Sequence, residues 1–200
     1  NKFILNKSDY KENKIYDLNI LNEILEVYPN EFIYELQLLK VLLSKILDNL
    51  LITNPRKEYW IKDGIQTYML IEYVNKKYPS ITLAGNLSKF PGLKSLYASK
   101  LKYNEKYFLS ITHMDRINNT QSLETPKDSL LKFNEKIANK HKSGLLLQNL
   151  VPEDRKSDFS NIIKNTLKLK KINSVSYFKN ELKKKFDYDN AYIDSILKLK

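Results

Sequence analysis

Glycine and proline are scarce in this chain, and their scarcity constrains the fold more than any other feature. The 200 residues include four glycines and six prolines. A fold with closely spaced turns, such as a β-sandwich, needs more of both, because these residues form most tight turns. Long helices joined by few sharp corners fit better, and no segment predicts a strand. We therefore expect an all-α, multi-helix domain.

Apolar residues recur at helical spacing along most of the chain, as at Leu36, Leu39 and Leu43. Breaks in the pattern coincide with residues that end helices, such as Asn54-Pro55. Residues 80–93 contain glycine and proline and predict a loop. The pattern predicts helices over residues 15–28, 31–52, 57–78, 105–117, 127–150, 153–170, 174–186 and 189–198.

The predicted organisation is a polar lead-in over residues 1–14 and a single helical domain over 15–200. The chain begins with Asn, and no signal peptide is visible, so we expect it to be an excised portion of a longer protein. No apolar run reaches the roughly 20 residues that a membrane span needs. The compartment stays open, and an exported or cell-envelope location is the one we favour.

Charge and cysteine content narrow the classes of function. The formal charge of +11 invites a nucleic-acid interpretation,. Lys greatly outnumbers Arg, however, and Arg is the better reader of bases and phosphates. We therefore expect a solvated lysine surface and no nucleic-acid partner. The chain has no Cys, which excludes disulfides, thiolate zinc sites and Cys nucleophiles,.

One segment of the predicted helix over 57–78 carries a pattern of its own, Trp60-x-x-Asp63-Gly64-x-x-x-Tyr68. A glycine inside a helix costs about 1 kcal/mol relative to Ala, so Gly64 indicates a close approach by another backbone. The pattern resembles the second zinc-helix motif of aminopeptidase N-type gluzincin peptidases. In that family, a Glu at the position of Asp63 is the third zinc ligand.

The resemblance implies an upstream H-E-x-x-H motif at a fixed distance from Asp63. That distance places the two His at Lys40 and Ser44 and the general-base Glu at Val41. Zinc catalysis needs three protein ligands and a position for water. Lys40, Val41 and Ser44 cannot supply them, so we expect no zinc, no other cofactor and no peptidase activity.

A second part of the resemblance lies downstream, in His141-Lys142-Ser143-Gly144. The family has Tyr-Glu-Lys-Gly there, and its Tyr stabilises the oxyanion. Gly144 matches, whereas His141 replaces the Tyr. The resemblance spans roughly residues 32–186, and it implies the helical part of a gluzincin catalytic region. The family's upstream Gly-x-Met-Glu-Asn strand is not in this chain.

Two expectations about the site follow from the resemblance. Lys40 would place its ammonium where the metal cation sits in the family and would pair with Asp63; the alternative is that both side chains point to solvent. Trp60, Asp63, Tyr68 and His141 would line a cleft that binds a peptide or protein partner.

Other polar residues favour structural roles. His141 could act as a general base oriented by Asp115 or Asp128, but a single His on a helix is more often structural. Glu31 and Glu35 share a helix face and predict surface charge.

The leading interpretation is a catalytically inactive, metallopeptidase-like domain that binds a peptide or protein. The first alternative is an active hydrolase whose site uses other residues or lies outside this chain. The second is a basic helical module for nucleic acid or membrane surfaces.

Overall fold

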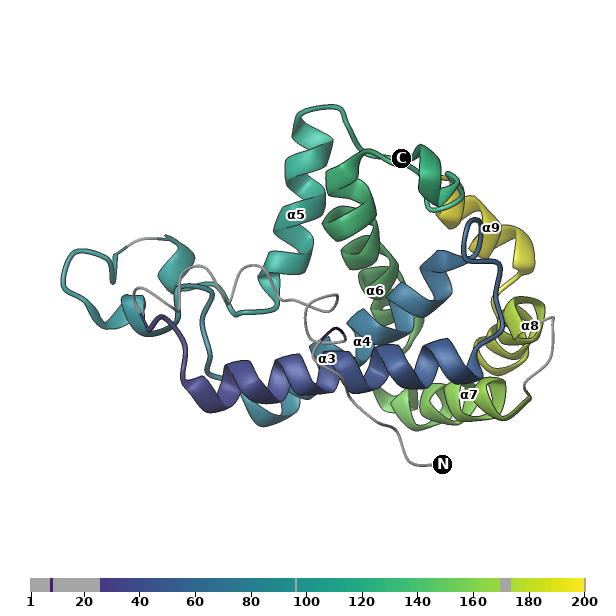
Figure 1. Ribbon diagram of the computed structural model, residues 1–200, viewed down its shortest axis with the longest axis horizontal. Helices are drawn as coiled ribbons and strands as arrows, with labels where there is room; N and C mark the ends of the chain where they lie inside the picture. The colour runs from purple at the N-terminus through teal and green to yellow at the C-terminus, as the bar shows by residue number, and fades with distance from the viewer. Residues whose placement is uncertain (1–7, 9–25, 96, 170–173, 200) are drawn as a thin grey trace. The chain divides into compact units, whose positions relative to one another are not determined.

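The computed structural model describes residues 8, 26–95, 97–169 and 174–199 (Figure 1). Within these residues the protein forms seven α-helices and no strand, and 71% of the structure is helical. The all-α prediction is therefore confirmed. In the part of the chain that is described, no helix is both long enough and apolar enough to span a membrane.

The helices follow the apolar periodicity closely. The predicted bounds of the helices over 31–52, 57–78, 105–117, 174–186 and 189–198 differ from the observed bounds by at most two residues at each end, the usual uncertainty of helix termini. The helix predicted over 15–28 lies outside the described residues, except for its last three, which are not helical. The observed α-helices are α3 Asn30–Leu50, α4 Tyr59–Lys77, α5 Glu105–Arg116, α6 Asn139–Leu150, α7 Lys156–Leu169, α8 Ser174–Phe186 and α9 Asn190–Lys198.

The predicted start of a helix near residue 127 is wrong. Lys127–Ser129 form only a short 3-10 turn, and Leu130 is extended. The amide side chain of Gln121 is the cause, because it donates to Ser129 O at 3.2 Å and accepts from Leu131 N at 2.7 Å. These backbone groups are therefore bound to a side chain instead of a helical turn. Regular helix follows later, through the π-helical turn Asn134–Ala138 that leads into α6.

The chain divides into two compact units. Unit 1 comprises Asn1–Lys45 and Met69–Lys106, and unit 2 comprises Ile46–Tyr68 and Tyr107–Lys200. The helices α3 and α4 each contribute one part to unit 1 and another to unit 2. The predicted boundary between a lead-in and a single domain stays a prediction, since residues 1–14 lie outside the described residues except for Ser8.

Unit 1 has a core rich in aromatic residues. The ring of Phe32 is fully buried and lies edge-on to Tyr78 and Tyr103, with centroid distances of 5.0 Å in both pairs. Residues 81–83 pair with 101–103 through Leu83 N to Leu101 O at 2.8 Å and Tyr103 N to Ile81 O at 3.0 Å. This pairing closes the base of the loop between them.

Unit 2 has a larger, mainly aliphatic core. Helices α7 and α8 lie side by side (Figure 1) and contribute Phe159 and Phe178, both fully buried with ring centroids 6.0 Å apart. The segment after α5 is tied to α9 by a hydrogen bond from Leu123 N to Leu197 O at 3.0 Å. Burial of each such large apolar side chain contributes about 2 kcal/mol to folding.

The first part of α4 crosses α6 at very short distance within unit 2. An added Cβ at Gly64 would lie 3.0 Å from Leu147 Cδ1 and 3.1 Å from the backbone oxygen of Ser143. An added Cβ at Gly144 would lie 2.3 Å from Cγ2 and 2.5 Å from Cβ of Thr67. Each helix therefore presents a glycine to the other.

The crossing confirms the prediction that Gly64 marks a close approach by another backbone. It also explains why glycine is tolerated in the middle of α4 despite its helix propensity. Gly144 has the same function on α6, and its contact with Thr67 is the tighter of the two. We name the contact among Gly64, Thr67, Ser143, Gly144 and Leu147 the glycine crossing.

Substitution of Gly144 by Ala should destabilise unit 2. The new methyl group would overlap the Cγ2 and Cβ atoms of Thr67, which are close to the backbone and cannot move away freely. We expect a loss of about 2 kcal/mol in the free energy of unfolding, even after the gain in helix propensity. Urea denaturation followed by circular dichroism measures the effect.

The Gly64→Ala and Asn149→Ala variants are the matched controls for this experiment. At Gly64 the added Cβ would lie no closer than 3.0 Å to any neighbour, whereas at Gly144 it would lie 2.3 Å from Thr67 Cγ2, so the loss should be smaller at Gly64. Asn149 lies on α6 but is exposed, and its replacement reports helix propensity alone. A Gly144→Ala variant as stable as the Asn149→Ala variant would contradict the close crossing.

Candidate functional site

Buried polar side chains lie beside the glycine crossing. Asn139 Nδ2 on α6 donates to the Tyr59 hydroxyl on α4 at 3.1 Å, and both residues are buried. One turn further along α6, Ser143 Oγ donates to the backbone oxygen of Asn139 at 2.8 Å. Asp63 is only 7% exposed and lies one turn from Tyr59 on α4. The two helices thus share a polar layer inside a mainly apolar core.

The electrostatics of this layer favour neutral hydrogen bonding over proton transfer. Burial raises the pKa of Tyr59, the hydrogen bond from Asn139 opposes that rise, and the charge of Asp63 adds to it. The Tyr59 phenol therefore stays protonated at neutral pH. A buried phenol and amide can hold two helices in register, but neither can take a proton from water at neutral pH.

Trp60 and Tyr68 lie in the core of unit 2. Trp60 is 3% exposed, with the Lys179 ammonium 5.9 Å from its ring centroid, and Tyr68 is 4% exposed. The Tyr68 ring lies edge-on to Phe159 at a centroid distance of 4.8 Å. Both aromatic rings therefore pack among core residues, and their position lends no support to a role in lining a cleft.

His141 lies half-buried on α6, and α5 lies beside α6 (Figure 1). Its Nδ1 is 2.7 Å from the Ser110 hydroxyl, and its ring lies edge-on to Tyr107 at a centroid distance of 4.7 Å. Ser110 Oγ also lies 2.9 Å from the backbone oxygen of Tyr107, to which it donates. Ser110 and Tyr107, both on α5, thus fix the orientation of the imidazole on α6.

The acids expected to orient His141 act on other residues. Asp128 forms an ion pair with Arg56, with Nε and Oδ1 2.9 Å apart, and this contact lowers the pKa of Asp128. The charge of Asp115 acts on Lys142, where it opposes the fall in pKa that burial causes. Lys142 Nζ donates to Leu199 O at 2.6 Å, which is a structural contact.

The positions that correspond to the family's H-E-x-x-H motif all lie on α3. Lys40 and Ser44 are half-buried, and Val41 is fully buried. These three residues belong to unit 1, whereas Asp63 belongs to unit 2. The pairing of Lys40 with Asp63 therefore stays a prediction. Within the described ranges, no three His, Asp or Glu side chains come close enough together to hold a metal ion.

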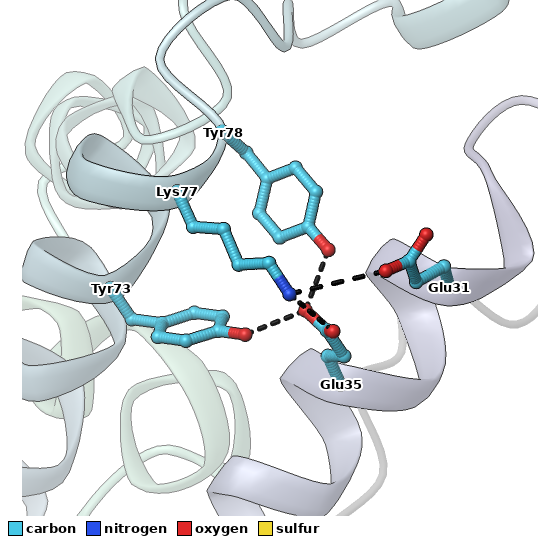
Figure 2. Close-up of polar contacts among 5 residues, drawn as sticks. All are labelled: Glu31, Glu35, Tyr73, Lys77 and Tyr78. Atoms are coloured by element: carbon cyan, nitrogen blue, oxygen red, sulfur yellow. Dashed lines mark hydrogen bonds and ion pairs between the residues drawn. The ribbon is translucent and has the colours of Figure 1, made fainter.

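A second cluster of titratable groups, shown in Figure 2, joins α3 to α4 in unit 1. Glu35 Oε2 accepts hydrogen bonds from the hydroxyls of Tyr73 and Tyr78, each at 2.6 Å. Glu35 Oε1 accepts from Lys77, which also lies 4.0 Å from Glu31. One carboxylate therefore receives three donors from α4 and the residue that follows it. We name Glu35, Tyr73, Lys77 and Tyr78 the Glu35 cluster.

The Glu35 cluster stabilises the ionised carboxylate strongly. The hydrogen bond from Lys77, followed by those from Tyr73 and Tyr78, lowers the pKa of Glu35 from 4.5 to about 2. Burial and the bond to Glu35 raise the pKa of Tyr78 to about 12. The pKa of Lys77 rises for the reciprocal reason, mainly its bond to Glu35. All members thus keep their ordinary neutral-pH charges, as expected of a structural cluster.

Sequence reasoning missed this cluster, because it assigned Glu35 to surface charge. The donors lie 38 to 43 residues further along the chain. A signal exists in the spacing of Tyr73 and Lys77, which lie four residues apart on one face of a helix, with Tyr78 directly after its end,. Their common acceptor becomes apparent only once α3 and α4 are packed.

Comparisons of this chain with known protein families, with curated proteins and with solved structures find no match. The resemblance to gluzincin peptidases therefore rests on the motif residues alone.

The stability of the protein should depend on the ionisation of Glu35. Because the pKa of Glu35 is lower in the folded state, its contribution is complete above pH 4.5 and is lost as the pH falls towards 2,. The Glu35→Gln variant should therefore show a smaller fall in melting temperature across that window. Thermal unfolding of both proteins at a series of pH values measures the difference.

The Glu31→Gln variant is the control for the pH series. Its carboxylate lies on the same helix one turn away, but its side chain is 75% exposed and 4.0 Å from Lys77. Its pH profile should follow that of the unmodified protein. Parallel profiles for the unmodified protein and Glu35→Gln would show that Glu35 is not stabilised as described.

Proposed function

We propose that this chain is a non-catalytic helical domain, a degenerate relative of the aminopeptidase N-type gluzincins, which binds a peptide or protein. The glycine crossing is the observation that carries the proposal. The two motif segments of the resemblance, around Gly64 and Gly144, are about 80 residues apart in the sequence, yet each glycine packs against the other segment. A chance match of two short patterns gives no reason for such mutual packing.

The residue types at the motif positions support loss of chemistry. An ammonium, an isopropyl group and a hydroxyl stand at Lys40, Val41 and Ser44, and none of them is a ligand or base at neutral pH,. His141, at the position of the family's oxyanion-stabilising Tyr, is held by Ser110 and Tyr107. The two motif segments thus pack against each other, but they carry none of the family's two His ligands, its general base or its oxyanion-stabilising Tyr.

The contact between Ser110 and His141 favours a second candidate, a hydrolase that uses Ser110 as its nucleophile. Two features of the geometry weigh against it. Ser110 Oγ donates to Tyr107 O, so its proton is not directed at His141 in this arrangement, and the role of His141 Nδ1 in their contact depends on the imidazole tautomer,. Ser110 also lies inside α5, where backbone N–H groups bind helical carbonyls and cannot form an oxyanion hole,.

Metal content tests the loss of chemistry. Because Lys40, Val41 and Ser44 supply neither an imidazole nor a carboxylate, we expect the unmodified chain to retain much less than one zinc ion per chain after gel filtration,. Metal analysis by mass spectrometry measures the content. Stoichiometric zinc in the unmodified chain would contradict the loss of chemistry.

A peptide pool separates the binding domain from the hydrolase. Incubation of the chain with synthetic peptides of mixed sequence, followed by gel filtration and mass spectrometry, should recover intact peptides with the protein. Cleavage products that disappear in the Ser110→Ala variant would instead establish the hydrolase. Peptides that are neither retained nor cleaved would contradict peptide binding.

A further inference from the structure

Residues 84–102 of unit 1, which we name the 84–102 loop, carry exposed apolar side chains. Phe90 is 56% exposed, Leu93 is 39% exposed and Tyr97 is 76% exposed. Side chains of this size are normally covered, and several together in one short segment indicate a surface that meets a partner.

Backbone hydrogen bonds hold the exposed residues in place. Leu93 N and Lys94 N both donate to Phe90 O, at 3.2 and 3.1 Å. The hydroxyl of Ser99 donates to Leu93 O at 2.7 Å. Gly92 has a φ of +90°, which an L side chain rarely adopts, and an added Cβ there would meet nothing within 4 Å. Phe90 and Leu93 thus flank a tight turn at a glycine with open space beside it.

The charged side chains of this segment all have the same sign. Lys89, Lys94, Lys100 and Lys102 are all exposed. The sequence contains no Asp or Glu from Tyr73 to Asn104, although carboxylates are frequent elsewhere in the chain. Four exposed lysines therefore lie in the same segment as the apolar turn, and the segment contains no acidic residue.

We propose that the 84–102 loop binds the surface of a membrane that contains anionic lipids. Phe90 and Leu93 would enter the boundary between headgroups and acyl chains, where burial of apolar groups provides affinity. Lys89, Lys94 and Lys100 would keep their ammonium groups among the anionic headgroups while their stems follow the apolar side chains inward. The loop is a peripheral contact and needs no membrane-spanning helix.

The composition of the loop favours lipid over nucleic acid. Nucleic-acid surfaces combine aromatic side chains that stack on bases with Arg that reads phosphates and base edges. Here the charges are all Lys, and Leu93 is aliphatic and cannot stack. An apolar turn among lysines matches an interface that is apolar inside and negatively charged outside.

Co-sedimentation with vesicles tests the proposal. The unmodified chain should sediment with vesicles of phosphatidylcholine and phosphatidylserine in equal parts, but not with phosphatidylcholine alone. The Phe90→Ser/Leu93→Ser variant should bind about tenfold more weakly, since it loses the apolar contacts. The Lys94→Gln/Lys100→Gln variant should lose roughly fivefold in affinity for each lysine removed.

Matched controls separate this loop from the general charge and hydrophobicity of the chain. Phe108→Ser removes an aromatic side chain on α5 that is 58% exposed, and Lys183→Gln/Lys184→Gln/Lys185→Gln removes three exposed lysines of α8. Both controls should bind as the unmodified chain does. Loss of binding in the controls equal to that in the loop variants would overturn the proposal, as would sedimentation with neither kind of vesicle.

A fluorescent reporter shows whether the loop itself enters the lipid. The chain has no Cys, so a polarity-sensitive dye can be attached at one site in the Tyr97→Cys variant. Its emission should shift to the blue with phosphatidylserine vesicles, whereas the same dye in the Tyr192→Cys variant on α9 should not respond. A shift with duplex DNA, and none with vesicles, would establish nucleic acid as the partner and overturn the proposal.

Discussion

The close packing of α4 against α6 is the contact on which the arrangement of unit 2 depends. Because neither helix has a Cβ at the centre of the contact, the backbones approach until Gly64 meets Ser143 and Gly144 meets Thr67. That approach sets the register in which Tyr59 reaches Asn139. The apolar side chains of α4 and α6 also belong to one buried cluster with those of α7, α8 and α9. Packing at this density leaves little room for added volume.

Unit 1 joins α3 to α4 by different means. Its aromatic core packs around Phe32, and the Glu35 cluster adds a partly exposed ionic contact at one side. A steric contact of the kind in unit 2 is insensitive to pH and salt, whereas an ionic contact near the surface responds to both. The helices α3 and α4 thus take part in two units whose stability responds to different conditions.

The sequence predicts the helices well, because apolar periodicity is a local property of the chain. It also identified Gly64, since a glycine within a helix is unfavourable unless something close by requires it. The prediction failed where a distant side chain intervened, as when Gln121 bound the backbone near residues 129–131. It failed for Glu35 for the same reason, because donors on another helix decide whether a carboxylate is surface charge or part of a cluster. For Trp60 and Tyr68, spacing alone could not distinguish core packing from the lining of a cleft.

The peptide-binding proposal and the membrane proposal rest on separate residues, so an experiment can contradict one of them without affecting the other. The peptide-binding proposal depends on motif positions on α3, α4 and α6, and on the packing of unit 2. The membrane proposal depends on exposed side chains of the 84–102 loop, whose shape comes from its own backbone hydrogen bonds and from its base at residues 81–83 and 101–103. No residue of that loop belongs to a motif position. A protein that lacked any kinship with peptidases would therefore still present the same apolar turn among lysines, and the partner of that turn has to be explained by its own chemistry.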